Sequence, residues 1–300
     1  ELREKTGAGM MDSKKALTET GGDMQAAIDW LRAKGIAKSE KKAGRVAAEG
    51  LVGIAVDGLK GAAVEVNSET DFVAKNELFT AMVGEIATAA LGADGDLAAL
   101  QAAKLPSSDK PVEAHVKEMV GQIGENMTVR RTQAVSVGQG LVASYVHNAA
   151  APGMGKIGVL AALESAAPAE ALEAFGKQLC MHIAAADPVP LSLDVDDLDP
   201  ALVEREKSVL TEQARESGKP DNIIEKMIVG RLNKYYQEVC LLKQAFVMNP
   251  DLSVEKAIAA AGEEAGADIK LTGFVRLKVG DGVEKEETDF AAEVAATVKG

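Results

Sequence analysis

The sequence predicts an α+β fold in which helices pack on antiparallel sheets. Apolar residues make up 47% of the chain and aromatic residues only 3%, so Ala, Val, Leu and Ile must build most of the core. Helical and strand-like periodicities occupy separate segments, and one order of segments occurs twice. At 300 residues the chain is long enough for two or three domains, each with a core of its own.

Short helices are predicted within residues 1–45. Glycines separate them: Gly7 ends the first, Gly21 and Gly22 end the second, and Gly35 ends the third, which Asp23 can cap. Small apolar side chains can close a three-helix core around Trp30, namely Ala16, Leu17, Ala27, Ile28 and Leu31. The polar, basic stretch "AKSEKKAGR" is predicted to be a linker, and we assign residues 1–45 to an N-terminal module.

At residue 51 the period changes from helical to alternating. "LVGIAVD", "GLKG" and "AAVEV" predict a strand, a turn and a strand. A helix is predicted from Asp71, with one apolar face formed by Phe79, Met82, Val83, Ile86, Ala87 and Ala90. A short helix, a loop at Pro106, a helix to about Gly124 and the strand "TVRRTQAVSV" follow. We assign residues 46–138 to this first unit.

The order of segments then repeats. Gly50-Leu51-Val52 recurs as Gly140-Leu141-Val142, and the strands "LVASYVH" and "KIGVLAAL" precede the helix "AEALEAFGKQLCMHIAAA". The closing strands of both copies end on paired glycines, and Gly124 and Gly266 precede those pairs at the same distance. We interpret this as a duplicated unit. The second unit comprises residues 139–187 and 239–282.

A helical hairpin interrupts the second unit over residues 188–238. Helices are predicted at about 200–217 and 221–238, and the short joint "SGKPDN" makes them antiparallel neighbours. Gly218 can end the first helix, and Asp221 or Asn222 can cap the second. Residues 283–300 predict a C-terminal helical module with Phe290, Val294 and Val298 on one face.

Charge and composition exclude several functions. The net charge is −13, with ten Lys and Arg against eight Asp and Glu in residues 1–50 and 23 against 38 in the rest. This acidic body argues against nucleic-acid binding. No run of eighteen apolar residues exists to span a membrane, and no signal peptide is visible. Two cysteines, Cys180 and Cys240, lie in apolar patterns, which predicts buried thiols and a cytoplasmic protein. The chain begins at Glu1, so we expect its natural start to lie upstream.

The motifs of enzymes and of nucleotide or metal sites are incomplete in this chain. "PGMGKIG", residues 152–158, lacks the first glycine of a phosphate loop, because Ala150 stands there, and Ile157 replaces the hydroxyl residue. His115, His147 and His182 show no metal-ligand spacing. Cys180 and His182 point to different helix faces. We therefore expect no cofactor, no metal and no direct nucleotide binding.

The tetrapeptide "ETDF" occurs at residues 69–72 and again at 287–290. In each copy Thr or Asp is predicted to cap the helix that follows. Phe72 lies seven residues before Phe79 and in phase with it, so spacing alone favours Phe72 as part of the buried stripe. The alternative is an exposed aromatic side chain that meets a partner.

Nine segments together resemble the bacterial translation elongation factor Ts family. They occur in the family's order: "LREKTGAGMMDSKKAL", "EVNSETDFVAKN", "IGENMTVRR", "YVH", "KIGVL", "SGKP", "EKMIVGR", "FVMNP" and "ETDFAAEVA". The resemblance implies a guanine-nucleotide exchange factor that binds elongation factor Tu in its GDP-bound and nucleotide-free forms and has no catalytic residues. It also implies an N-terminal module like ubiquitin-associated domains, a core of two related halves, the inserted hairpin and a C-terminal helix.

The resemblance also implies the residues that meet elongation factor Tu. Asp71 and Phe72, flanked by Thr70 and Val73, are expected to project from a turn, where the ring wedges into the GTPase domain and disturbs its magnesium site. The other expected contacts are Met10, Met11, Lys14, Ile123, Gly124, His147, Val247, Met248 and Phe290. Met10 and Met11 suit core packing equally well. "NAAAPGMG" after His147 is longer than the family's turn.

Two rival functions belong to other classes. The first is a small-molecule enzyme that uses the carboxylates of the "ETDF" segments, which predicts a convergent polar pocket. The second is a ubiquitin-associated adaptor, which would involve residues 1–45 alone. The sequence leaves homodimerisation and the role of the helical hairpin open.

Overall fold

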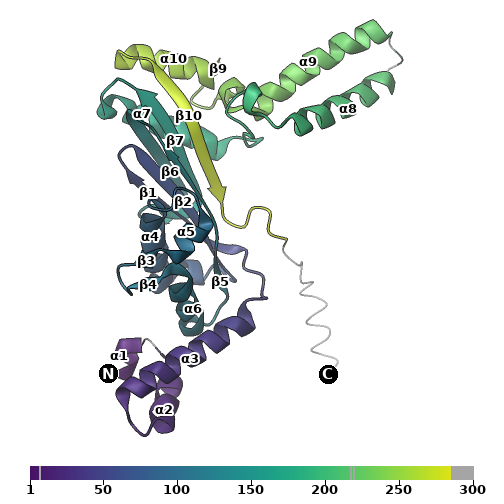
Figure 1. Cartoon of the computed structure of the whole chain (residues 1–300). Coiled ribbons are helices and arrows are strands. Elements are labelled where there is room, and N and C mark those ends of the chain that lie inside the picture. The colour runs from purple at the N-terminus through teal and green to yellow at the C-terminus, as the bar shows by residue number, and fades with distance from the viewer. Residues whose placement is uncertain (7, 217, 219, 285–300) are drawn as a thin grey trace.

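The computed structural model describes residues 1–6, 8–216, 218 and 220–284, and it has an α+β architecture (Figure 1). Helices cover antiparallel strands in the middle of the molecule. The N-terminal helices lie at one end, and the hairpin of α8 (Pro200–Glu216) and α9 (Asp221–Val239) projects from the other (Figure 1). The candidate contact residues are therefore distributed along an elongated molecule.

The N-terminal helices are α1 (Leu2–Thr6), α2 (Met10–Glu19) and α3 (Met24–Lys42). Asp23 caps α3 as predicted, because its carboxylate accepts the N–H of Ala26 at 2.8 Å. The predicted end at Gly35 is wrong: α3 continues to Lys42, so most of the supposed linker is helical. Gly35 faces Gly121 of the later helix α6 (Val112–Ile123), where a Cβ on Gly121 would lie 2.7 Å from the Cα of Gly35. This glycine permits a close helix crossing and does not end the helix.

The predicted small core of this module is present. Leu2, Ala16 and Ala27 are buried, with Leu17, Ile28 and Leu31 packed against them. Trp30 is only partly buried, and the ammonium of Lys34 lies 4.0 Å from the centre of its ring. Trp30 therefore lies at the margin of the core and not at its centre.

The first unit has the predicted order. Its strands are β1 (Glu49–Asp57), β2 (Lys60–Ser68) and β5 (Met127–Ser136), which form one half of a six-stranded sheet with β2 between β1 and β5. The helices are α4 (Glu77–Ala90), α5 (Leu97–Ala102) and α6 (Val112–Ile123), and a small hairpin of β3 (Lys104–Leu105) and β4 (Lys110–Pro111) precedes α6. All six apolar positions predicted for α4 are buried.

The segment assigned to the second unit also combines three antiparallel strands with helices and a small hairpin. Its strands are β6 (Gly140–Ala151), β7 (Met154–Ser165) and β10 (Ile269–Lys278), with β7 in the middle. Its helices are α7 (Ala169–Ala185) and α10 (Val254–Ala265), and a small hairpin of β8 (Ala245–Phe246) and β9 (Asn249–Ser253) precedes α10. Because Met154 begins a strand, "PGMGKIG" leads into a sheet and not into a helix that could hold phosphate.

Matched glycines occur in the two units. Gly50 is the second residue of β1 and Gly140 the first of β6, with φ of 123° and 117°, and at either position a Cβ would lie 2.1 Å from a carbonyl oxygen of the neighbouring strand. Only glycine fits such an approach. Gly124 and Gly266 end α6 and α10 in the left-handed conformation.

The strands of the two units form one six-stranded sheet and share an apolar layer. Along β1, Leu51 faces the helices of its own unit, and Val52 faces the second unit. Along β7, Leu163 packs with α7, and Leu160 packs in the layer shared with Val52. β1 and β7 also pair directly, but only at Val52–Gly155 and Gly53–Met154. Successive side chains of a strand point to opposite faces. Each unit therefore has a core covered by its own helices, and the two units share a further apolar core.

Two helices lie close to the predicted ranges, α8 (Pro200–Glu216) and α9 (Asp221–Val239), preceded by the 3₁₀ turn η2 (Val195–Asp197). Neither predicted cap of α9 forms, since the N-cap residue is Pro220 and no side chain bonds there. Residues 285–300, with Phe290 and the predicted C-terminal helix, lie outside the described residues.

Both cysteines are buried free thiols, as predicted. Burial raises the pKa of the Cys180 thiol to about 12, which keeps it protonated and unreactive at neutral pH. Within the described part of the chain, no helix combines the length and apolar character needed to cross a bilayer.

Candidate partner-binding site

Residues 69–76 form the connection between β2 and α4. The predicted start of a helix at Asp71 is wrong, because α4 begins at Glu77 and its N-cap is Asn76. The Asn76 amide oxygen accepts the N–H groups of Leu78 and Phe79 at 2.9 and 3.4 Å. The sequence carried this signal in "NELF", since asparagine is among the best capping residues. Thr70 and Asp71 are therefore free of a capping role.

Phe72 is exposed, with 78% of its surface accessible. The helical phase that links it to Phe79 is interrupted by the 3₁₀ turn η1 (Val73–Lys75). The reading of Phe72 as part of the buried stripe is therefore wrong. Val73, the next residue, is only 6% exposed and packs into the core of the first unit, so it fixes the base of the turn. An aromatic side chain held out from a packed base is typical of a binding surface.

The turn is braced by the loop that follows α6. The Glu125 carboxylate accepts the N–H of Thr70 at 2.9 Å and its hydroxyl at 2.7 Å. In return, the Glu69 carboxylate accepts the N–H of Asn126 at 2.5 Å. Charged acceptors make strong hydrogen bonds. Sequence reasoning missed this brace, because the partners are more than fifty residues apart in the chain.

Lys75 connects Asp71 with Phe72. Its ammonium lies 3.1 Å from the Asp71 carboxylate and 6.0 Å from the centre of the Phe72 ring. The hydrogen bond from Lys75 holds the pKa of the Asp71 carboxyl below its ordinary value. Asp71 therefore presents a negative charge at neutral pH beside the exposed ring.

The structure brings Ile123 and Gly124 to this turn. They immediately precede Glu125, and the carbonyl oxygen of Gly124 accepts a hydrogen bond from the ammonium of Lys42 at the end of α3. Ile123 is partly buried against the core of the first unit. The longer α3 thus reaches the site and connects it to the N-terminal module.

Met10 and Met11 lie on α2 and are 66% and 77% exposed, so their reading as core residues is wrong. Lys14, one turn later, is also exposed. Methionine side chains adapt to irregular apolar partners. This helix therefore offers a second apolar surface, on the N-terminal module.

His147, Val247 and Met248 lie outside the turn. His147 is exposed on β6, opposite Ile157, and its Nδ1 is 3.2 Å from the hydroxyl of Tyr145. Val247 and Met248 form the tip of the β8–β9 hairpin and are 49% and 42% exposed. They are in the second unit, whereas Phe72 is in the first.

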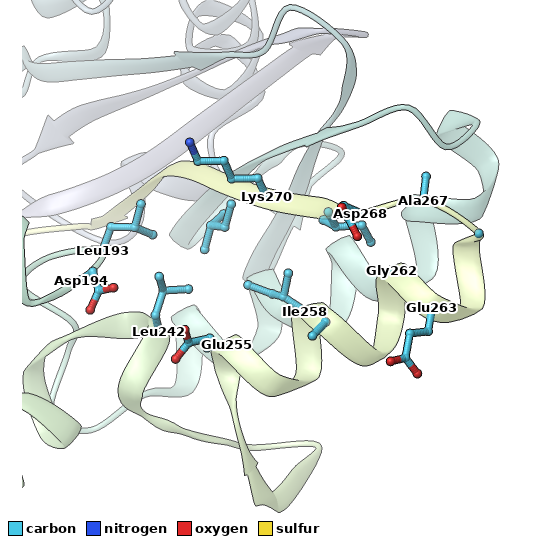
Figure 2. Close-up of a pocket in the computed structure, with 14 residues that line it drawn as sticks. Leu193, Asp194, Leu242, Glu255, Ile258, Gly262, Glu263, Ala267, Asp268 and Lys270 are labelled. Atoms are coloured by element: carbon cyan, nitrogen blue, oxygen red, sulfur yellow. The ribbon is translucent and has the colours of Figure 1, made fainter.

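A groove of about 840 Å³ lies between α10 and the start of β10 (Figure 2). Apolar side chains such as Ile258 line it, with the carboxylates of Asp194 and Glu255 toward one end and those of Glu263 and Asp268 toward the other (Figure 2). Asp194 and Glu255 are both paired with Lys243. Neither Glu69 nor Asp71 lines it, so the groove gives no support to an enzyme based on the "ETDF" carboxylates. Nowhere in the described ranges do three or more His, Cys, Asp or Glu side chains form a group that could hold a metal ion.

An exposed aromatic side chain on a firmly packed turn, with further exposed apolar side chains elsewhere on the molecule, is the arrangement expected of a protein that binds another protein. The family model described as elongation factor Ts matches residues 69–281. Proteins named elongation factor Ts from Parvibaculum lavamentivorans, Rhizobium meliloti and Bartonella henselae are 60%, 59% and 56% identical over 300 residues, which is all of this chain and 97% of each relative. The chain belongs to the elongation factor Ts family, the guanine-nucleotide exchange factors of elongation factor Tu.

Proposed function

We propose that the turn of Thr70, Asp71 and Phe72 is the element that accelerates GDP release from elongation factor Tu. The Phe72 ring enters between helices of the GTPase domain and disturbs its magnesium site, and Asp71 adds a negative charge next to it. The observation that carries this proposal is the 78% exposure of Phe72 on a base held by Val73 and Glu125. A rigid turn loses little entropy when it binds.

Thermodynamic linkage defines what this turn must do. A factor that lowers the affinity of elongation factor Tu for GDP must itself bind the GDP-bound form less tightly, by the same ratio. The ring must therefore fit the opened GTPase domain better than the closed one. Each tenfold weakening of GDP requires about 1.4 kcal/mol of that preference. Burial of one phenylalanine in a pocket supplies energy of this size.

The remaining contacts anchor the factor. Met10, Met11 and Lys14 on α2, His147 on β6, and the tip of Val247 and Met248 would bind elongation factor Tu in both its GDP-bound and nucleotide-free forms. Contacts that are equal in the two states raise affinity without changing the rate at saturation. Homodimerisation is not required, since one chain presents both the turn and the anchors.

The domain organisation proposed from the sequence fits this division of roles. An N-terminal module like ubiquitin-associated domains, a duplicated core, an inserted hairpin and a C-terminal helical module would each occupy a separate part of the partner. The matched glycines Gly50 and Gly140 support the duplication. Only the first unit has a long connection before its first helix, residues 69–76, whereas residues 166–168 make that connection in the second. Because translation takes place there, we place the protein in the cytoplasm.

The proposed function is tested by measuring release of labelled GDP from elongation factor Tu with and without this chain. We expect the release rate to rise with factor concentration and to reach a plateau. Turnover of a small molecule by the isolated chain, with no change in GDP release, would favour the enzyme instead.

Replacing Glu125 by alanine removes the acceptor of both Thr70 bonds. We expect the exchange rate at saturating factor to fall about threefold to tenfold, because the turn loses its brace, and stability to fall by about 1 kcal/mol. The control is Glu113→Ala in the first turn of α6, where the carboxylate pairs with the exposed Lys117 at 2.6 Å. Equal exchange rates in the two variants would show that the brace has no part in exchange.

Replacing Asp71 by alanine should slow exchange at saturating factor without lowering stability. The reason is that Asp71 is exposed and caps no helix, and surface substitutions of this kind change stability by about 0.5 kcal/mol or less. Asn76→Ala provides the comparison for thermal unfolding, since loss of a cap costs about 1 kcal/mol. A stability loss in the Asp71 variant as large as in the Asn76 variant would contradict this assignment.

A further inference from the structure

The anchor tip of Val247 and Met248 is attached to the protein interior through a buried histidine. The N–H of Val247 donates to Nδ1 of His182 on α7 at 3.2 Å. His182 is 1% exposed, although it is polar. A buried polar side chain is retained at a cost in desolvation, so its partners indicate what it holds in place.

The bonding pattern fixes the protonation of His182. Because Nδ1 accepts, the single ring proton of the neutral form lies on Nε2, which donates to the amide oxygen of Gln244 at 3.0 Å. The amide nitrogen of Gln244 donates to the carbonyl oxygens of Pro188 and Glu238 at 3.0 and 2.7 Å. Burial lowers the pKa of His182, which favours this neutral form. The tip is thus connected by one satisfied chain of hydrogen bonds to both ends of the inserted segment, residues 188–238.

Aromatic packing also holds the β8–β9 hairpin at its base. Phe246, the residue before the tip, is 4% exposed. Its ring centre is 5.6 Å from that of His182 and 6.0 Å from that of Phe175. His182 therefore contacts the β8–β9 hairpin twice, by its ring, which lies tilted against Phe246, and by Nδ1 at Val247.

We propose that His182 is a positioning residue for the binding of elongation factor Tu: its Nδ1 holds the backbone of Val247 so that the tip of Val247 and Met248 is preformed for the partner. The inference rests on the proposed anchoring role of this tip. A preformed tip has its main effect on affinity, because ordering it during binding would reduce the net binding energy. His182 touches no nucleotide, so exchange at saturating factor should not depend on it.

Two substitutions separate positioning from packing. His182→Asn keeps an acceptor oxygen at the depth of Nδ1, whereas His182→Gln keeps a polar group at the depth of Nε2, near Gln244, and loses the acceptor for Val247. Each variant loses one buried hydrogen bond, so the two substitutions should lower the thermal stability of the protein by similar amounts. We expect the Gln variant to bind GDP-bound elongation factor Tu about tenfold more weakly and the Asn variant within about threefold of the wild type. The exchange rate at saturation should stay within about twofold in both.

A double-mutant cycle shows whether His182 affects binding through the tip of Val247 and Met248. In the Val247→Asp, Met248→Ala background, His182→Gln should weaken binding by less than about twofold further, because the group it positions is already lost. If the tip variant binds as tightly as the wild type, the anchoring role is wrong and this inference falls with it. If the tip variant binds weakly but the Asn and Gln variants bind equally, the anchor stands and only the role of His182 is overturned.

Discussion

Replacing Phe72 by alanine is expected to lower the rate of GDP release at saturating factor by about tenfold or more. The ring is the largest exposed apolar side chain of the turn, and its proposed site lies inside the partner. At 78% exposure its truncation leaves no cavity in this protein, so stability should change by about 0.5 kcal/mol or less. Stopped-flow release of labelled GDP and thermal unfolding of the free variant measure the two effects.

Leu59→Ala is the matched control for Phe72→Ala. Leu59 is also an exposed apolar residue, at 42%, but it lies in the β1–β2 turn, at the opposite end of these strands from residue 68. Its loss should leave exchange unchanged. A loss of about 3–5 kcal/mol in the Phe72 variant, as for a core truncation, would show that the ring packs internally and not on the partner.

The substitution Val247→Asp with Met248→Ala is expected to weaken binding of elongation factor Tu about thirtyfold or more, because it replaces an apolar anchor by a charge that must lose its water. The exchange rate at saturation should change far less, since the anchor contributes equally to both nucleotide states. Calorimetric titration gives the affinity, and release kinetics extrapolated to saturation give the rate.

The first unit offers a control for that double substitution. Its β3–β4 hairpin occupies the corresponding place before α6, and Ser107 at its tip is exposed. Ser107→Asp adds a charge to a similarly placed turn without changing the proposed anchor, and we expect this variant to bind elongation factor Tu as tightly as the wild type. Equal affinities of the double variant and the wild type would remove Val247 and Met248 from the interface.

The strands, the apolar face of α4 and the helical hairpin could be predicted from the sequence because their signals are local. Alternation identified β1 and β2, and helical spacing identified the buried face from Phe79 to Ala90. At Gly50 and Gly140 the sequence shows glycine because the close backbone approach at each position allows glycine alone. Such features need no knowledge of distant segments.

Most of the errors arose where the role of a residue depends on a partner far away in the sequence, and one arose from a local turn. Glycine commonly ends a helix, but Gly35 lies within α3 and permits α3 to cross α6 closely at Gly121. Phe72 is in phase with Phe79, yet the 3₁₀ turn between them changes the phase. The brace from Glu125 to Thr70 and the bond from Val247 to His182 join segments more than fifty residues apart. For the partner-binding residues, the resemblance to a family supplied what spacing alone could not.

The central claim is that the turn of Thr70, Asp71 and Phe72 distinguishes the nucleotide states of elongation factor Tu, whereas the tip of Val247 and Met248 does not. The most direct test measures the affinity of the factor for nucleotide-free and for GDP-bound elongation factor Tu. The ratio of these affinities equals the factor by which GDP binding is weakened. We predict that Phe72→Ala lowers this ratio about tenfold and that Val247→Asp with Met248→Ala lowers both affinities while leaving the ratio unchanged. A Phe72 variant that loses affinity equally for both states would contradict the account.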